Sequence, residues 1–226
     1  MTSDAARALP KRRGRTLLVL LLVLGALLTG ALAARRWYAP RALPPVTMVA
    51  TLYPAARPLP PFELTAQDGS RFDTGRLRGR WTLLFFGFTS CPDACPTTLL
   101  ELAAVRRALA DLPPAVAPQV VMISVDPERD TPARLAAFLG HFDPAFVGAT
   151  GSSAAIAALA AGVGVAVQAG AATDGGYTVE HGASVFLVDP RVAAVALFPL
   201  PHLARAIAAD YRLIVAAERP AAAGRG

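Results

Sequence analysis

The sequence predicts an α/β domain in which helices cover a central mixed sheet. Two continuous apolar runs, at residues 81–88 and 120–125, have the length and composition of strands that are buried on both faces. A segment with helical features follows each run, and the chain closes with a strand pair and a long helix within residues 184–217. This order of strands and helices is typical of an α/β sandwich.

The folded domain is expected to begin at residue 62 with a hairpin. The turn dipeptide Asp68–Gly69 lies between two short segments that contain apolar residues, 62–64 and 71–72. After the strand at residues 81–88, a helix is predicted from about Pro96, because apolar residues recur on one of its faces. These residues are Leu99, Leu102, Val105 and Leu109.

The second helix is predicted to start at Asp130-Thr131-Pro132, with a capping residue and a proline at its first turn, and to run to residue 142. Residues 162–176 are rich in glycine and alanine and give no clear prediction. The remaining elements are a short strand at 146–147, an alanine-rich helix at 152–161, strands at 184–188 and 192–198, and a closing helix at 203–217.

An uncharged apolar segment at residues 16–34 is about long enough to cross a bilayer as a helix. The basic residues of segment 1–15 place that end in the cytoplasm and the domain on the outer side of the membrane. The alternative is a cleaved signal peptide, because Ala31-Leu32-Ala33 resembles a cleavage site. We favour the retained anchor, and both alternatives carry the domain across the membrane.

Three further segments complete the expected organisation. Residues 35–61 contain seven prolines and are expected to form an extended linker. The core-forming domain is expected to occupy residues 62–217, and residues 218–226 to form a disordered tail.

The formal charge of +6 belongs to the N-terminal segment and not to the domain. Residues 1–45 hold eight basic residues and one acidic residue, whereas the rest of the chain holds 14 basic and 15 acidic residues. A nearly neutral domain lacks the basic surface that binding to a nucleic-acid backbone requires. We therefore exclude a nucleic-acid-binding function.

The two cysteines of the chain, Cys91 and Cys95, lie in a loop between the strand at 81–88 and the helix that follows. Such strand ends are where α/β folds place their chemistry, and the start of a helix should stabilise both thiolates. The spacing is one residue wider than in the C-x-x-C dithiols of oxidoreductases, which leaves room for a soft metal such as Cu(I) between the sulfurs. A redox pair remains the alternative at this point.

Four segments in this order resemble the SCO/SenC family: GFTSCPDACPTTLLEL, ISVDPERDTPARLAAFL, FVGATG and VEHGASVFLVDP. The resemblance covers residues 62 to about 211. It implies a thioredoxin-like fold and a membrane-tethered copper chaperone for the binuclear copper A site of cytochrome c oxidase. It also implies that Cys91, Cys95 and His181 bind copper as Cu(I) or Cu(II). The chain departs from the family where Glu180-His181-Gly182 replaces the usual Asp-His-Ser.

The other polar candidates are assigned structural roles. His141 ends the second helix and should contact its last carbonyls, and His202 is expected to be solvated at the start of the last helix. Segment 126–130 is explained by a turn and a helix cap. Asp93, between the cysteines, is as consistent with a loop carboxylate as with a group that tunes the metal.

Together these features predict a copper metallochaperone that is not an enzyme. The expected partner is the cytochrome c oxidase subunit that carries the copper A site. A single lysine against 21 arginines is typical of a GC-rich bacterial genome, which suggests the inner membrane with the domain on the periplasmic side. The alternative is a membrane-anchored thiol–disulfide oxidoreductase that reduces the oxidase cysteines. Against it stands the absence of proline between Val179 and Ser184, where thioredoxin-like oxidoreductases generally carry a cis-proline.

Overall fold

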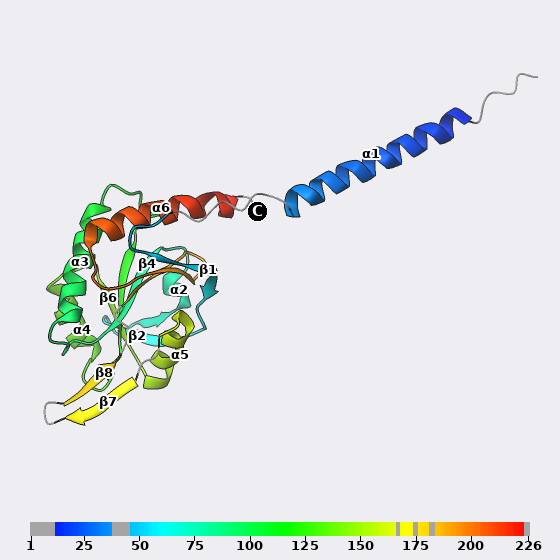
Figure 1. Ribbon diagram of the computed structural model, residues 1–226. Coiled ribbons are helices and arrows are strands. Elements are labelled where there is room, and N and C mark those ends of the chain that lie inside the picture. The colour runs from blue at the N-terminus through cyan, green and yellow to red at the C-terminus, as the bar shows by residue number, and fades with distance from the viewer. Residues whose placement is uncertain (1–11, 38–45, 166–167, 174–175, 181–183, 224–226) are drawn as a thin grey trace, which may run out of the picture. The chain divides into compact units, whose positions relative to one another are not determined.

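The computed structural model describes residues 12–37, 46–165, 168–173, 176–180 and 184–223 (Figure 1). The chain divides into two compact units, residues 1–43 and 44–226. In the first unit the structure describes helix α1 (Arg12–Trp37), which includes the apolar segment 16–34. None of the helices in the described parts of the chain combines the length and the hydropathy that a membrane span requires.

The second unit is built on an eight-stranded sheet with the order β1-β10-β9-β4-β5-β6-β2-β3 (Figure 1). Strands β4, β5 and β6 are parallel and the other pairs are antiparallel, so the predicted mixed sheet is confirmed. Its strands are β1 (Thr51–Pro58), β2 (Glu63–Ala66), β3 (Arg71–Asp73), β4 (Thr82–Gly87), β5 (Gln119–Ser124), β6 (Val147–Thr150), β9 (Val185–Val188) and β10 (Ala193–Phe198). The two strands predicted from apolar runs, β4 and β5, lie side by side near the middle.

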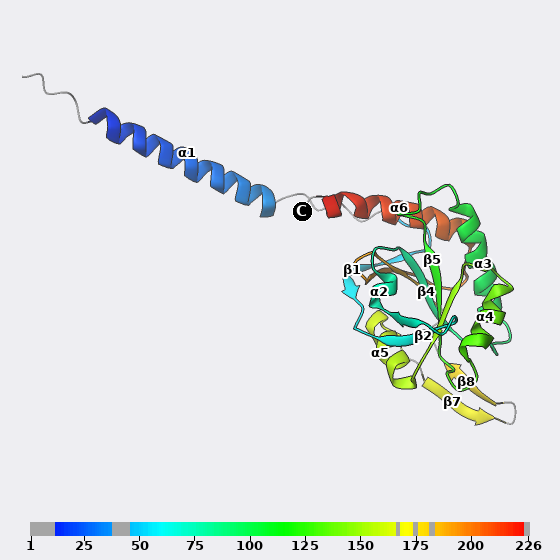
Figure 2. The same ribbon diagram turned by 180° about the vertical axis from the view of Figure 1, so that it is seen from behind.

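Helices cover both faces of this sheet, as the two opposite views show (Figures 1 and 2). Alternate residues of β4 point to opposite faces: Leu83 packs in one core cluster and Leu84 in the other. The first cluster also holds residues of α3 (Ala94–Ala108), α4 (Pro132–Gly140) and α6 (Ala204–Ala223). The second holds residues of α2 (Thr74–Leu77) and α5 (Ser153–Val163).

Local signals for turns and helix starts are confirmed. The hairpin β2–β3 turns at Gly69, whose φ of +80° suits glycine. Thr131 caps α4 by accepting a hydrogen bond from the Arg134 N–H at 3.3 Å, and Ser152 caps α5 in the same way. The glycine- and alanine-rich segment contains strand β7 (Gln168–Thr173), which pairs with β8 (Gly176–Glu180) in a separate two-stranded sheet.

The folded unit begins before residue 62, inside the segment predicted to be a linker. Strand β1 pairs with β10 at the edge of the main sheet, where a missing proline N–H is tolerated. Before it, the N–H groups of residues 48–50 donate to the buried Asp210 carboxylate at 2.7–2.8 Å. At the other end, α6 runs to Ala223, into the segment predicted to be a tail. The first difference arises because contacts distant in sequence order residues 48–58.

Candidate metal centre

The loop that carries the two cysteines leaves the carboxyl end of β4 and enters α3. The helix begins at Ala94, two residues before the predicted start, so Cys95 lies in its first turn. Pro96 is then the third residue of the helix. Its missing N–H removes no helical bond, because the first four N–H groups of a helix have no partner within it. The first bond runs from the Thr97 N–H to the Asp93 carbonyl, at 3.1 Å.

Both cysteines are free thiols, and they meet at the same point of the loop. Cys91 is partly buried, whereas Cys95 is only 2% exposed. The Cys95 N–H points at the Cys91 Sγ at 3.4 Å, which places the first sulfur over the start of α3. This arrangement presents two sulfur donors of unequal accessibility at the end of a central strand.

The space for the inner thiol depends on Gly87, the last residue of β4. A Cβ atom at this position would lie 3.0 Å from the Cys95 Sγ and 3.0 Å from the Phe85 ring. These distances are tighter than ordinary van der Waals contact. A larger residue at position 87 would therefore crowd the Cys95 side chain. The backbone conformation does not require glycine here, because the φ of Gly87 lies outside the left-handed region.

The sequence predicts a stabilised thiolate at Cys95, and this prediction is wrong for the metal-free protein. Burial raises the pKa of Cys95 from 9.0 to about 12, and the nearby Cys91 and Asp130 add to the increase. A backbone hydrogen bond from Phe88 opposes this shift but does not cancel it. Loss of hydration thus outweighs the start of the helix, and a metal that binds Cys95 must displace its proton.

We predict that the two thiols differ in reactivity in the folded, metal-free protein. At pH 8, Cys95 should be alkylated by iodoacetamide at least about 100-fold more slowly than in denaturant, because a pKa near 12 lowers its thiolate fraction and burial blocks access. Peptide mapping by mass spectrometry would follow each cysteine, with Cys91 as the internal control. Equal rates for Cys95 in the folded and denatured protein would contradict the buried, protonated thiol.

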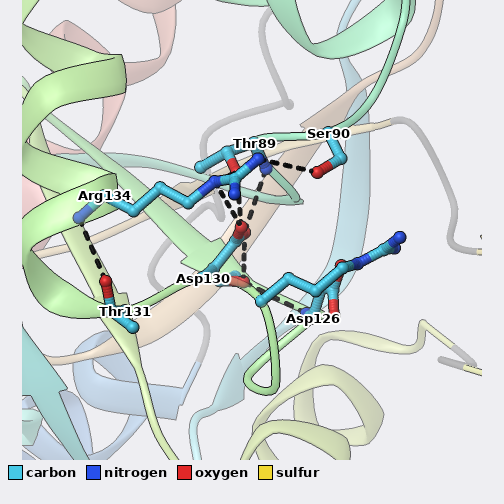
Figure 3. A network of polar contacts seen from close by, with 8 residues as sticks. Thr89, Ser90, Asp126, Asp130, Thr131 and Arg134 are labelled. Atoms are coloured by element: carbon cyan, nitrogen blue, oxygen red, sulfur yellow. Dashed lines mark hydrogen bonds and ion pairs between the residues drawn. The ribbon is translucent and has the colours of Figure 1, made fainter.

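The acidic residues after β5 lie beneath the cysteine loop (Figure 3). Asp126 and Asp130 are both fully buried. The helix cap expected within segment 126–130 is wrong, because Thr131 caps α4. Asp130 instead binds the loop residue Thr89, a role that the sequence did not indicate. Asp93 takes the N-cap position of α3 but caps no backbone N–H; its carboxylate accepts a bond from the Thr97 hydroxyl at 3.3 Å.

Two of the three histidines can be placed. His141 ends α4 and contacts the Ala137 carbonyl through Nδ1 at 2.6 Å, as predicted. The prediction for His202 is wrong, because the side chain is buried. Its Nε2 donates to the Phe198 carbonyl at 3.2 Å and its Nδ1 accepts from the Thr98 hydroxyl at 3.0 Å, while burial lowers its pKa.

His181 lies outside the described residues, but its neighbours in sequence are placed. Strand β8 ends at Glu180 and β9 begins at Val185. Val185 is paired with Phe85 in the antiparallel β4–β9 register, so β9 begins at the end of the sheet where the cysteine loop starts. Among the described residues, no three side chains of His, Cys, Asp or Glu form a group that could hold a metal ion.

The chemistry of the two sulfurs fits a soft ion. Thiolate ligands select Cu(I), and an added imidazole would also suit Cu(II). The partly exposed Cys91 would be accessible to an incoming ion, and the buried Cys95 would be the inner ligand.

Comparison with known proteins identifies relatives along most of the folded unit. The family model SCO1/SenC matches residues 51–216. The mitochondrial protein SCO1 homolog 1 of Arabidopsis thaliana is 37% identical over 143 residues, which are 63% of this chain and 42% of that protein. The chain thus spans less than half of that relative's length. Most of the residues outside the family-model match lie before residue 51.

Two solved structures share the fold closely. The copper-bound ScoI of Arabidopsis thaliana has a TM-score of 0.64 and 33% identity, and the match covers 70% of this chain and 98% of that one. The copper-bound ScoI of Bradyrhizobium japonicum has a TM-score of 0.61 and 39% identity, covering 69% of this chain and 98% of that one. The SCO1/SenC family model matches most of the length of this chain, and the chain therefore belongs to the SCO1/SenC family.

Proposed function

We propose that this protein is a copper metallochaperone that holds Cu(I) or Cu(II) through Cys91, Cys95 and His181. The observation that carries the proposal is the pair of free thiols gathered at the end of β4. It is supported by the copper held in the related structures from Arabidopsis thaliana and Bradyrhizobium japonicum.

The assignment of His181 as third ligand is supported by the register of the sheet. The chain enters β9 next to the end of β4, so the segment before Val185 starts from the side of the sheet that carries the cysteines. Two thiolates and one imidazole form a three-coordinate site. Such a site leaves the ion open to stepwise ligand exchange with a recipient that offers more donors.

We further propose that the recipient is the cytochrome c oxidase subunit that carries the copper A site, as the family membership suggests. Segment 16–34 would anchor the protein in the bacterial inner membrane, with the copper-binding unit on the periplasmic side. In this role the protein transfers an ion and turns over no substrate, so it is not an enzyme.

A thiol–disulfide oxidoreductase is the second candidate, favoured by the closeness of the two free cysteines. An attacking thiol works best when its pKa is near the ambient pH. The raised pKa of Cys95 makes it a poor attacking group, which would leave Cys91 as the nucleophile and Cys95 as the resolving thiol.

One experiment separates the two functions. The full chain is purified in its reduced form in detergent and loaded with Cu(I) in the presence of a competing chelator. A parallel copper-free sample is tested for reduction of a disulfide-bonded protein substrate, with excess reduced glutathione to regenerate its thiols. The chaperone predicts one copper per chain, thiolate-to-copper charge-transfer bands after oxidation to Cu(II), and negligible reductase turnover. Sustained reductase turnover without retained copper would overturn the proposal in favour of the oxidoreductase.

A further inference from the structure

We propose that Asp130 is a positioning residue that holds the cysteine loop in its copper-binding shape before the ion arrives. This inference rests on the proposed function. Together with Arg134, Asp130 fixes Thr89 and Ser90, the two residues that immediately precede Cys91 (Figure 3). We call these four side chains the loop clamp.

The carboxylate of Asp130 is the centre of the loop clamp. It is fully buried and accepts bonds from the Thr89 N–H at 2.9 Å, the Ser124 hydroxyl at 2.7 Å and the Thr89 hydroxyl. A buried carboxylate is costly unless hydrogen bonds satisfy it, and here two of the three donors belong to Thr89. The interactions that stabilise the charge therefore also fix the backbone of the loop.

Arg134 of α4 adds a second set of bonds to the same two residues. Its Nε donates to the Thr89 Oγ1 at 2.7 Å and its Nη2 to the Ser90 Oγ at 3.0 Å. The same Nε lies 3.9 Å from the Asp130 Oδ1. The guanidinium thus links α4 to the loop that follows β4. Asp130 links the same loop to Ser124 of β5.

A comparison within the chain separates this role from general stabilisation of the fold. Asp189 is also buried, accepts two backbone N–H bonds at 2.9 Å and contacts an arginine, Arg191. Its backbone donors belong to the β9–β10 turn itself. That turn follows Val188, which is paired with Thr82 at the opposite end of β4. Asp189 is therefore a matched carboxylate that has no contact with the cysteine loop.

The loop clamp reduces the conformational entropy that the protein loses when copper binds. Each backbone residue that the ion must order when it binds lowers the affinity by about a factor of ten. With the loop clamp intact, Thr89 and Ser90 are ordered in the metal-free protein. Without it, the ion would have to order them when it binds.

The test uses the full chain in detergent, with Asp130→Asn, Thr89→Val, Thr89→Ser and Asp189→Asn. Two quantities are measured: amide hydrogen exchange of residues 89–91 without metal, and Cu(I) affinity by competition with a chelator. We expect Asp130→Asn to speed exchange at Thr89 at least about tenfold and to weaken Cu(I) binding about 10- to 100-fold. Thr89→Val should weaken binding about tenfold, and Thr89→Ser, which keeps the hydroxyl, should restore it.

Unchanged exchange and affinity in Asp130→Asn and Thr89→Val would overturn the inference, and so would an equal loss of copper in Asp189→Asn. If Asp130→Asn does not fold, the Thr89→Val and Thr89→Ser pair decides. If the unaltered chain holds no copper, the proposed function fails, while the exchange measurement still decides whether Asp130 orders the loop.

Discussion

Replacing Cys91 or Cys95 with serine is expected to lower Cu(I) affinity at least about 1000-fold, because a neutral hydroxyl is a poor ligand for a soft ion. Each variant removes one of the two sulfur donors at the end of β4. Competition with a chelator of known affinity would measure the loss, together with the disappearance of the thiolate charge-transfer bands in the Cu(II) form.

The two serine variants should differ in stability although they share the loss of copper. Cys95 is buried, so a serine there places a hydroxyl in apolar surroundings and should cost about 1–2 kcal/mol of unfolding free energy. Cys91 is partly exposed and its replacement should cost less. Urea unfolding of the metal-free variants provides this control. If either serine variant holds copper as tightly as the unaltered chain, the two-sulfur site is wrong.

The second large effect is expected at His181. Changing it to alanine should weaken Cu(II) binding about 100-fold or more, because Cu(II) needs the imidazole nitrogen beside the sulfurs, while Cu(I) binding should fall less. Electron paramagnetic resonance of the Cu(II) form would report the lost nitrogen ligand. The unfolding free energy should stay within about 0.5 kcal/mol of the unaltered chain, if His181 acts as a ligand and not in the core.

His141→Ala is the matched control, because that histidine is exposed and contacts the Ala137 carbonyl of its own helix. It should leave the Cu(II) spectrum unchanged. An unaltered spectrum in His181→Ala, or the same spectral change in both variants, would remove His181 from the site.

The parts of the fold that the sequence predicts are those with strong local signals. Buried strands such as β4 consist of unbroken apolar residues, and the starts of α4 and α5 carry capping side chains. The segment before residue 62 lacks such signals. Its strand, β1, depends on pairing with β10 and on the contact of residues 48–50 with Asp210, and neither partner is near in the sequence.

In the candidate site, too, features with a local sequence signal are predicted and features that depend on distant residues are not. The spacing of Cys91 and Cys95 and their place after a buried strand are visible in the sequence, and the structure brings the two thiols together. The protonation of Cys95 is not visible, because it depends on burial by several elements. For the same reason the buried state of His202 and the contacts of Asp130 with the cysteine loop escape prediction, since both depend on residues about 40 to 100 positions away.

Copper K-edge X-ray absorption of the loaded full chain reports the ligands of the copper. We expect two sulfur scatterers per copper in the Cu(I) form, with an imidazole nitrogen as the third ligand and its multiple-scattering pattern lost in His181→Ala. A copper surrounded only by oxygen and nitrogen, or one that keeps both sulfurs after Cys91 is replaced, would rule out the ligand set Cys91, Cys95 and His181.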